Sequence, residues 1–92
     1  MTQPQHKKFS VKLTKTAQKD YHSIRDAKLR RGVNRIIDEI KEDPYQFKKL
    51  SGPFAHLRSA KTFSFRVMYQ INENGELLVW VVAMEHRKDV YR

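Results

Sequence analysis

The chain has 92 residues, and its 19 lysines and arginines against 10 aspartates and glutamates give it a net charge of +9. It contains no cysteine, which excludes disulfides and thiolate chemistry. A basic excess of this size favours a polyanionic partner such as nucleic acid, although it says nothing about the fold. We expect one small domain over residues 1–92.

The first element is a predicted strand over residues 7–14. Apolar side chains alternate there with polar, mostly lysine side chains, which is the period of a strand with one buried face. A lysine-rich outer face is typical of an edge strand.

Two helices are predicted next. Thr14 or Thr16 can cap the first, and apolar residues recur at helical spacing through residue 24. After a short break, a second apolar stripe runs over residues 29–40. Asp43-Pro44 ends this helix, because the residue before a proline is disfavoured in the α region.

The second half of the chain predicts three antiparallel strands. A connector over residues 45–53 leads to a weak strand signal at Phe54–Ser59, and residues 63–71 alternate strongly. Asn74-Gly75 is a hairpin signal, and the apolar run Leu77–Met84 predicts a central strand. The expected fold is therefore α+β: an N-terminal strand, a two-helix hairpin and a three-stranded meander forming one sheet with the helices packed on one face.

Phosphodiester chemistry without a metal is the activity that the residues suggest. Phosphate-binding loops, serine-nucleophile motifs and metal-ligand clusters are absent from the sequence. Metal-free RNA cleavage needs a base for the 2′-hydroxyl, an acid for the 5′-oxygen and cations for the charge on the phosphate. The last seven residues, 86–92, place an imidazole, three cations and a phenol directly after the apolar strand. We therefore expect this segment to form part of a functional site.

Arg66 is the second candidate. Its place in the strand alternation is opposite to Phe65 and Val67, where it is either an ordinary exposed arginine or a ligand contact. Arg58, on the preceding predicted strand, could lie alongside it. Together with the C-terminal segment, these arginines predict a composite cationic site.

Four stretches of the chain resemble the RelE/ParE superfamily of bacterial toxins from toxin–antitoxin modules. They are Leu13–Tyr21, Asp43-Pro44 followed by Lys48–Gly52, Phe65–Ile71 and His86–Tyr91, and they span nearly the whole chain. The resemblance implies a toxin that enters the ribosomal A site and cuts messenger RNA without a metal or another cofactor. It also implies a cognate antitoxin, with the 70S ribosome and mRNA as the other partners.

The resemblance also implies which residues act. Arg66 corresponds to the arginine of the FRVMY strand, Arg87 to the C-terminal arginine and Tyr91 to the terminal tyrosine, while Arg58 matches a basic position. Further RNA contacts are expected from exposed basic side chains elsewhere. These are Lys48, Lys49, His56, Lys61, Lys88 and Arg92.

The general base is the position at which the sequence departs from the family. RelE-like enzymes carry lysines on the strand where this chain has Phe54 and His56. His56, His86 and Lys61 are possible substitutes, and we favour His86 because it adjoins Arg87.

Two other functions are compatible with the sequence. ParE-like members of the superfamily poison DNA gyrase and do not cut RNA, and a basic module could bind nucleic acid or the ribosome without chemistry. The set Arg66, Arg87 and Tyr91 favours the RNA-cleaving interpretation. The first residues lack the apolar segment of a signal peptide and no run is long enough to span a membrane, so we expect a cytoplasmic protein with no membrane partner.

Overall fold

One mixed sheet of five strands, in the order β1-β5-β4-β3-β2, forms the centre of the fold. The computed structural model describes residues 9–62, 64–72, 74 and 77–86. The elements are β1 (Ser10–Leu13), α1 (Lys15–His22), α2 (Ala27–Glu42), β2 (Lys48–Lys49), β3 (Arg58–Lys61), β4 (Phe65–Ile71) and β5 (Leu78–His86). Short 3-10 turns lie at Pro44–Gln46 and Gly52–Phe54. None of the helices in these ranges is long and apolar enough to cross a membrane.

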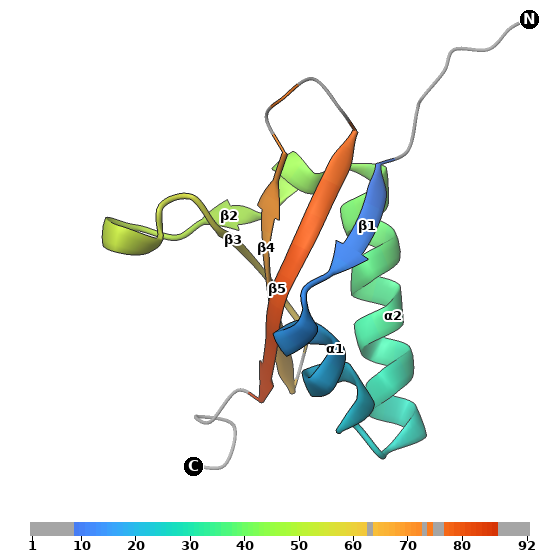
Figure 1. The fold of residues 1–92 in the computed structure, drawn as a ribbon. Coiled ribbons are helices and arrows are strands. Elements are labelled where there is room, and N and C mark those ends of the chain that lie inside the picture. Colours follow the sequence, from blue (N-terminus) through green and yellow to red (C-terminus); the bar gives the residue numbers. More distant parts are fainter. Residues whose placement is uncertain (1–8, 63, 73, 75–76, 87–92) are drawn as a thin grey trace, which may run out of the picture.

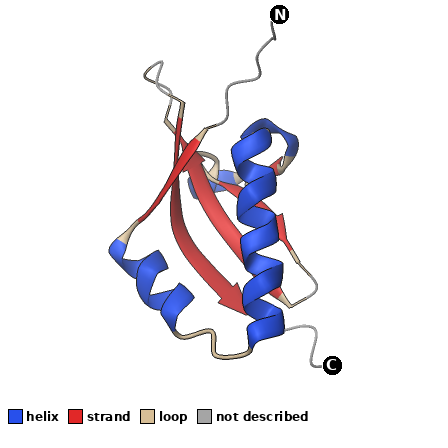
Figure 2. Ribbon diagram, turned by 90° about the vertical axis from the view of Figure 1, so that its right-hand side faces the viewer, coloured by secondary structure: helices blue, strands red, loops and turns tan. Residues whose placement is uncertain are grey.

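Both helices pack on the same face of the sheet (Figures 1 and 2). β5 lies in the middle, parallel to β1 and antiparallel to β4, and β4, β3 and β2 continue the sheet in antiparallel order. The predicted α+β fold, with an N-terminal edge strand, a two-helix hairpin and a central last strand, is confirmed. The parallel pairing of β1 with β5 was not predicted.

Local sequence explains where each helix begins and ends. The Thr14 hydroxyl, and not that of Thr16, caps α1 by accepting a hydrogen bond from the Ala17 amide. Asp26 caps α2 by accepting from the amides of residues 28 and 29. The second helix ends before Pro44, as predicted.

The core lies between the helices and the sheet face that they cover. In β4 every second residue is buried, and the intervening Arg66, Met68 and Gln70 point to the opposite face. We call this helix-free face the open face. The core residues are Ala17, Ile24, Val33, Ile36, Ile40, Ala60, Phe65, Val67, Tyr69, Ile71, Val79, Val81 and Met84.

The predicted strand at Phe54–Ser59 was misplaced. Gly52, with a φ of 65°, and Pro53 form a 3-10 turn through Phe54, whose side chain is exposed, and β3 begins only at Arg58. The two residues Lys48–Lys49, predicted to be part of a connector, pair with β3 as β2. The last strand is longer than predicted and extends to His86.

A β-bulge interrupts β5 at Val82. Met68 pairs with Ala83 but Tyr69 pairs with Val81, so that one residue of β5 has no partner in β4. On its other side, β5 loses its neighbour at the same level, because β1 ends at Leu13 opposite Val81. From this level on, side chains at the start of α1 and within it form hydrogen bonds with the backbone of β5 in place of β1.

Thr14 and Asp20 supply the missing partners. The Thr14 hydroxyl donates to the Val82 carbonyl over 3.1 Å, and an Asp20 carboxylate oxygen accepts from the Met84 amide over 3.0 Å. The backbone of β5 is therefore satisfied beyond the end of β1, and α1 is fixed against the sheet.

We predict that Asp20→Ala lowers the free energy of unfolding by about 2 kcal/mol, because the Met84 amide then loses a charged acceptor in a partly buried place. Urea unfolding measures the change. Asp38→Ala, at an exposed position on α2, is the matched control and should change the stability by less than about 0.5 kcal/mol. Equal effects of the two substitutions would contradict the role of Asp20.

Candidate functional site

Arg66 occupies the centre of the open face. In the strand register it lies between Lys61 on β3 and Glu85 on β5. The side chain is partly buried, and its Nε atom is fully buried without a hydrogen-bond partner among the described residues. A buried donor of this kind is available for a ligand, since its desolvation is already complete.

A hollow of about 430 Å³ lies beside Arg66. Lys48 and Lys61 line it from β2 and β3. Lys61 pairs with Arg66, and Lys48 pairs with Ser59, which is two residues from Lys61, so both lysines lie on the open face. We call this site, lined by Gln46, Phe47, Lys48, Leu50, Ser59, Lys61 and Arg66, the cationic hollow. It brings together three of the predicted site residues and offers an anion cationic side chains from three strands.

Arg58 is not part of this group. Its register partner is the buried Tyr69, so its side chain lies on the helix-covered face, opposite to that of Arg66. There Nη1 donates to the carbonyls of Phe47, at 2.7 Å, and Tyr45, at 3.3 Å. Its guanidinium carbon also lies 5.4 Å from the centroid of the Tyr45 ring. The expectation that Arg58 lies alongside Arg66 was wrong, and its contacts hold the connector between α2 and β2.

His86 also lies on the helix-covered face. It pairs with Phe65 across β4 and β5, and the two rings are tilted by 37° with centroids 4.3 Å apart. The sheet therefore separates the imidazole from the side of Arg66. The strand register does not support the expectation that His86 is the base beside that arginine.

His56 groups with Arg58 and not with Arg66. A small hollow of about 140 Å³ is lined by Lys49, His56, Arg58 and neighbouring residues. Lys49 pairs with Arg58, which again places it opposite to Lys48. The remaining predicted site residues, Arg87, Lys88, Tyr91 and Arg92, lie outside the described residues.

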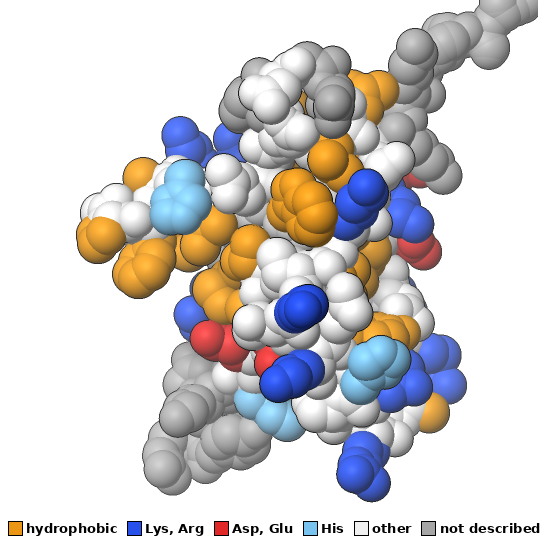
Figure 3. All heavy atoms as spheres, viewed as in Figure 1, with side chains coloured by type: hydrophobic (Ala, Val, Ile, Leu, Met, Phe, Trp, Pro, Cys, Tyr) orange, Lys and Arg blue, Asp and Glu red, His pale blue; other side chains and the backbone are white. Residues whose placement is uncertain are grey.

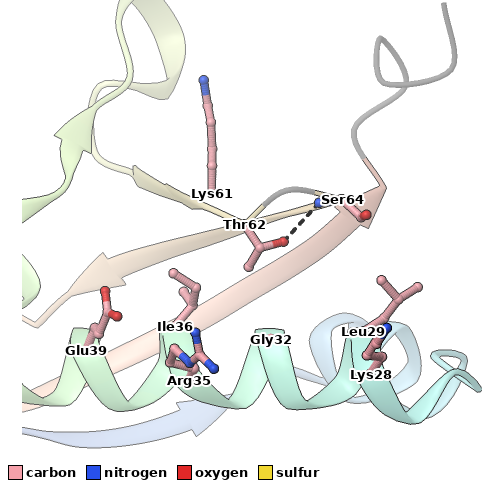
Figure 4. Close-up of a pocket in the computed structure, with 9 residues that line it drawn as sticks. All are labelled: Lys28, Leu29, Gly32, Arg35, Ile36, Glu39, Lys61, Thr62 and Ser64. Carbon is pink, nitrogen blue, oxygen red and sulfur yellow. Dashed lines mark hydrogen bonds between the residues drawn. The ribbon is translucent and has the colours of Figure 1, made fainter.

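A larger hollow of about 550 Å³ separates α2 from the turn that follows β3 (Figure 4). Leu29 and Ile36 point from the helix toward this turn, whereas the Lys61 side chain extends away from α2. The Ser64 amide donates to the Thr62 hydroxyl over 3.2 Å and closes the turn. Lys61 thus lines both hollows, and its ammonium group points away from α2.

The charge of the surface agrees with an anionic partner. Lysine and arginine side chains are more prominent than acidic ones on the face seen in Figure 3. Within the described parts of the chain, no three His, Asp or Glu side chains come together in a way that could hold a metal ion.

Comparison with known proteins identifies the family. A model of the ParE toxin of the type II toxin–antitoxin system parDE matches residues 11–91. The chain belongs to this toxin family. The predicted membership of the RelE/ParE superfamily is thereby confirmed, and the protein is the toxin of a toxin–antitoxin module.

Individual relatives agree with this assignment. Toxin RelG of Mycobacterium tuberculosis is 27% identical over 85 residues, which cover 91% of this chain and 97% of RelG. The toxin–antitoxin complex RelBE2 of M. tuberculosis contains a chain with a TM-score of 0.78 at 23% identity, over 87% of this chain and 92% of that one. The isolated RelE toxin of E. coli has a TM-score of 0.71 at 20% identity, over 91% and 90%. The two structures share the fold of this toxin.

Sequence reasoning missed two residues beside Arg66. Glu85 lies 19 positions from Arg66 in the sequence, and only the cross-strand register brings the two residues together. Ser59 was overlooked because β3 was placed too early in the chain. A strand that begins at Arg58 would have put Ser59 and Lys61 on one face through the period of two.

We predict that Arg58→Ala lowers the toxin's free energy of unfolding by about 1.5 kcal/mol, because two backbone carbonyls lose a charged donor. Lys49→Ala, on the adjoining strand, is the control and should stay within about 0.5 kcal/mol of the wild type. Urea unfolding of both variants checks the difference. A variant Arg58→Ala with wild-type stability but no toxicity would return Arg58 to the functional site.

Tyr69 gives a prediction about pH. Its buried hydroxyl donates to the Pro44 carbonyl over 2.5 Å, and burial raises the pKa of Tyr69 well above its ordinary value, partly offset by Arg58. The raised pKa means that the neutral phenol stabilises the fold fully below about pH 10 and that this stability is lost as the pH rises further. Between about pH 9 and pH 11, the wild type should therefore lose more unfolding free energy than Tyr69→Phe. Parallel curves for the two proteins would contradict this.

Proposed function

We propose that this toxin is a ribosome-dependent endoribonuclease that cleaves messenger RNA in the cytoplasm and so inhibits translation. The observation that carries the proposal is the buried Nε of Arg66, which has no hydrogen-bond partner among the described residues and lies in a hollow with Lys48 and Lys61. A guanidinium that shares one hollow with two ammonium groups on the same side of it is suited to the charge that develops on a phosphate during cleavage.

The cleavage step assigns a task to each part of the site. The 2′-hydroxyl loses its proton to a base, and its oxygen forms a bond to phosphorus. The bond from phosphorus to the 5′-oxygen breaks as that oxygen takes up a proton from an acid, for which Tyr91 is the candidate. Arg66 stabilises the charge on the phosphate oxygens, and Lys48 contacts the RNA backbone. Lys61 replaces His86 as the candidate base, because among the three proposed substitutes it shares the open face with Arg66.

The C-terminal residues complete the proposed site. Arg87 and Tyr91 position the scissile phosphate or the adjacent base, as the resemblance to RelE-like toxins implies. Lys88 and Arg92 add phosphate contacts. In the sequence, this segment follows directly after His86 of β5.

A cognate antitoxin is the proposed protein partner. The M. tuberculosis RelBE2 structure is a toxin–antitoxin complex, and an E. coli RelE variant has been solved with a peptide of the antitoxin RelB. The antitoxin of this toxin should carry acidic side chains, because the chain that it neutralises has a net charge of +9.

Inhibition of DNA gyrase without RNA cleavage is a second candidate function. Two observations favour it: the matching family model describes a ParE toxin, and His86 lies on the sheet face opposite to Arg66. A non-catalytic basic module that binds nucleic acid or the ribosome is the remaining alternative.

We predict that Arg66→Ala abolishes growth arrest on inducible expression and lowers the cleavage of a translated message by about 10²-fold to 10³-fold, since a main donor to the phosphate is lost. Primer extension on the message, with and without ribosomes on the site, measures the cleavage. Arg31→Ala, at an exposed position on α2, is the control and should keep both activities.

The same experiment separates the candidate functions. Full cleavage by Arg66→Ala would contradict its assigned role. Growth arrest with intact messenger RNA and a loss of DNA supercoiling would instead establish the gyrase-directed function.

A further inference from the structure

Ser59 is a buried polar residue of the cationic hollow. It lies on β3, in register with Lys48 on one side and Met68 on the other, and its side chain lines the cationic hollow. The residue is only 8% exposed, and its hydroxyl oxygen is buried without a hydrogen-bond partner among the described residues. A buried hydroxyl normally has a partner, because leaving it unpaired costs stability.

The same hollow contains a second buried donor that has no partner in the described part of the chain. The Nε atom of Arg66 is in this state, and both atoms belong to residues that line the cationic hollow. Arg30 has a comparable Nε atom, but another nitrogen of that guanidinium donates to the Ile24 carbonyl over 2.6 Å. Two unpaired donors in one cationic hollow fit an anionic group with several acceptor oxygens.

We propose that the Ser59 hydroxyl and the Arg66 Nε together bind a phosphate group, with Ser59 donating to one of its non-bridging oxygens. This inference rests on the proposed function insofar as the physiological phosphate is that of an RNA backbone. Hydrogen bonds from these donors to an anionic oxygen are charge-assisted and short-range, so they fix the orientation of the phosphate. Lys48 and Lys61 contribute charge from exposed and therefore adaptable positions.

Entry of the anion requires a local rearrangement. Both donor atoms are covered in the free protein, and the hollow is lined by long side chains, among them those of Gln46, Lys48 and Lys61. Lys48 and Lys61 are exposed, so their side chains can move and the ammonium groups can follow the anion, whereas Gln46 is held by hydrogen bonds to two backbone carbonyls. On binding, the Ser59 hydroxyl and the Arg66 Nε each gain a hydrogen-bond acceptor on the anion.

The test is an NMR titration of the intact toxin with inorganic phosphate at constant ionic strength. The 15N-labelled Arg66 side chain gives an Nε–H resonance, which is identified by its absence in Arg66→Lys. We expect a saturable shift of this resonance that chloride does not produce. A resonance that phosphate leaves unmoved would overturn the proposal without any variant of Ser59.

Variants of Ser59 test the hydroxyl itself. Ser59→Ala should weaken phosphate binding about tenfold, whereas Ser59→Thr, which keeps a hydroxyl, should bind within about twofold of the wild type. Ser10→Ala removes an exposed serine at the far edge of the same sheet and should leave the affinity unchanged. Wild-type affinity in Ser59→Ala would overturn the role of Ser59.

Thermal stability provides a readout that separates binding from structure. Removing an unpaired buried hydroxyl should raise the Tm of the free toxin by about 5 °C, whereas a hydroxyl that supports the fold would lower it when removed. Phosphate binding that depends on Ser59 in a toxin that leaves messenger RNA intact would support the anion site and reject the nuclease function. A folded toxin that neither binds phosphate nor cleaves messenger RNA would reject the anion site and the nuclease function together.

Discussion

The backbone of β5 beyond the end of β1 is the constraint on which the site depends. A central strand must satisfy hydrogen-bonding groups on both sides, yet β1 stops at Leu13 while β5 continues to His86. Thr14 and Asp20 satisfy the Val82 carbonyl and the Met84 amide, so β5 continues without a neighbouring strand on the side that β1 has left. The cap of α1 and the extension of β5 therefore depend on the same few side chains, and β5 stays paired with β4 as far as His86.

The core and the candidate site share the strand β4. Burial of Phe65, Val67 and Tyr69 against the helices leaves Arg66 no orientation other than the open face. Packing on one face thus fixes the position of the guanidinium on the other, and β2 and β3 add Lys48 and Lys61 beside it. A substitution that loosens the core under β4 would also displace the charge that we assign to phosphate binding.

Elements with a strong helical or strand period were predicted correctly from the sequence. Side-chain positions that depend on the exact limits of a strand were not. The alternation in β4 placed Arg66, and helical spacing placed both helices. The expected positions of Arg58 and His86 near Arg66 are not supported, because the face of each side chain depends on the register of a four-residue strand and on the position of a bulge. A shift of one residue exchanges the two faces of a strand, and no local pattern reveals it. β2, with two residues, is too short to show any period.

The extra residue at Val82 has a consequence for how toxins of this fold can diverge. Before the bulge, the odd-numbered Val79 and Val81 are buried; after it, the even-numbered Met84 is buried. One inserted or deleted residue at this point would exchange Glu85 and His86 between the two faces and leave the packing of the first half of β5 unchanged. Such a one-residue shift changes which side chain of β5 lies beside Arg66, and the order of the strands stays the same. The bulge is therefore a position at which a single codon can change the face of the strand that carries Glu85 or His86.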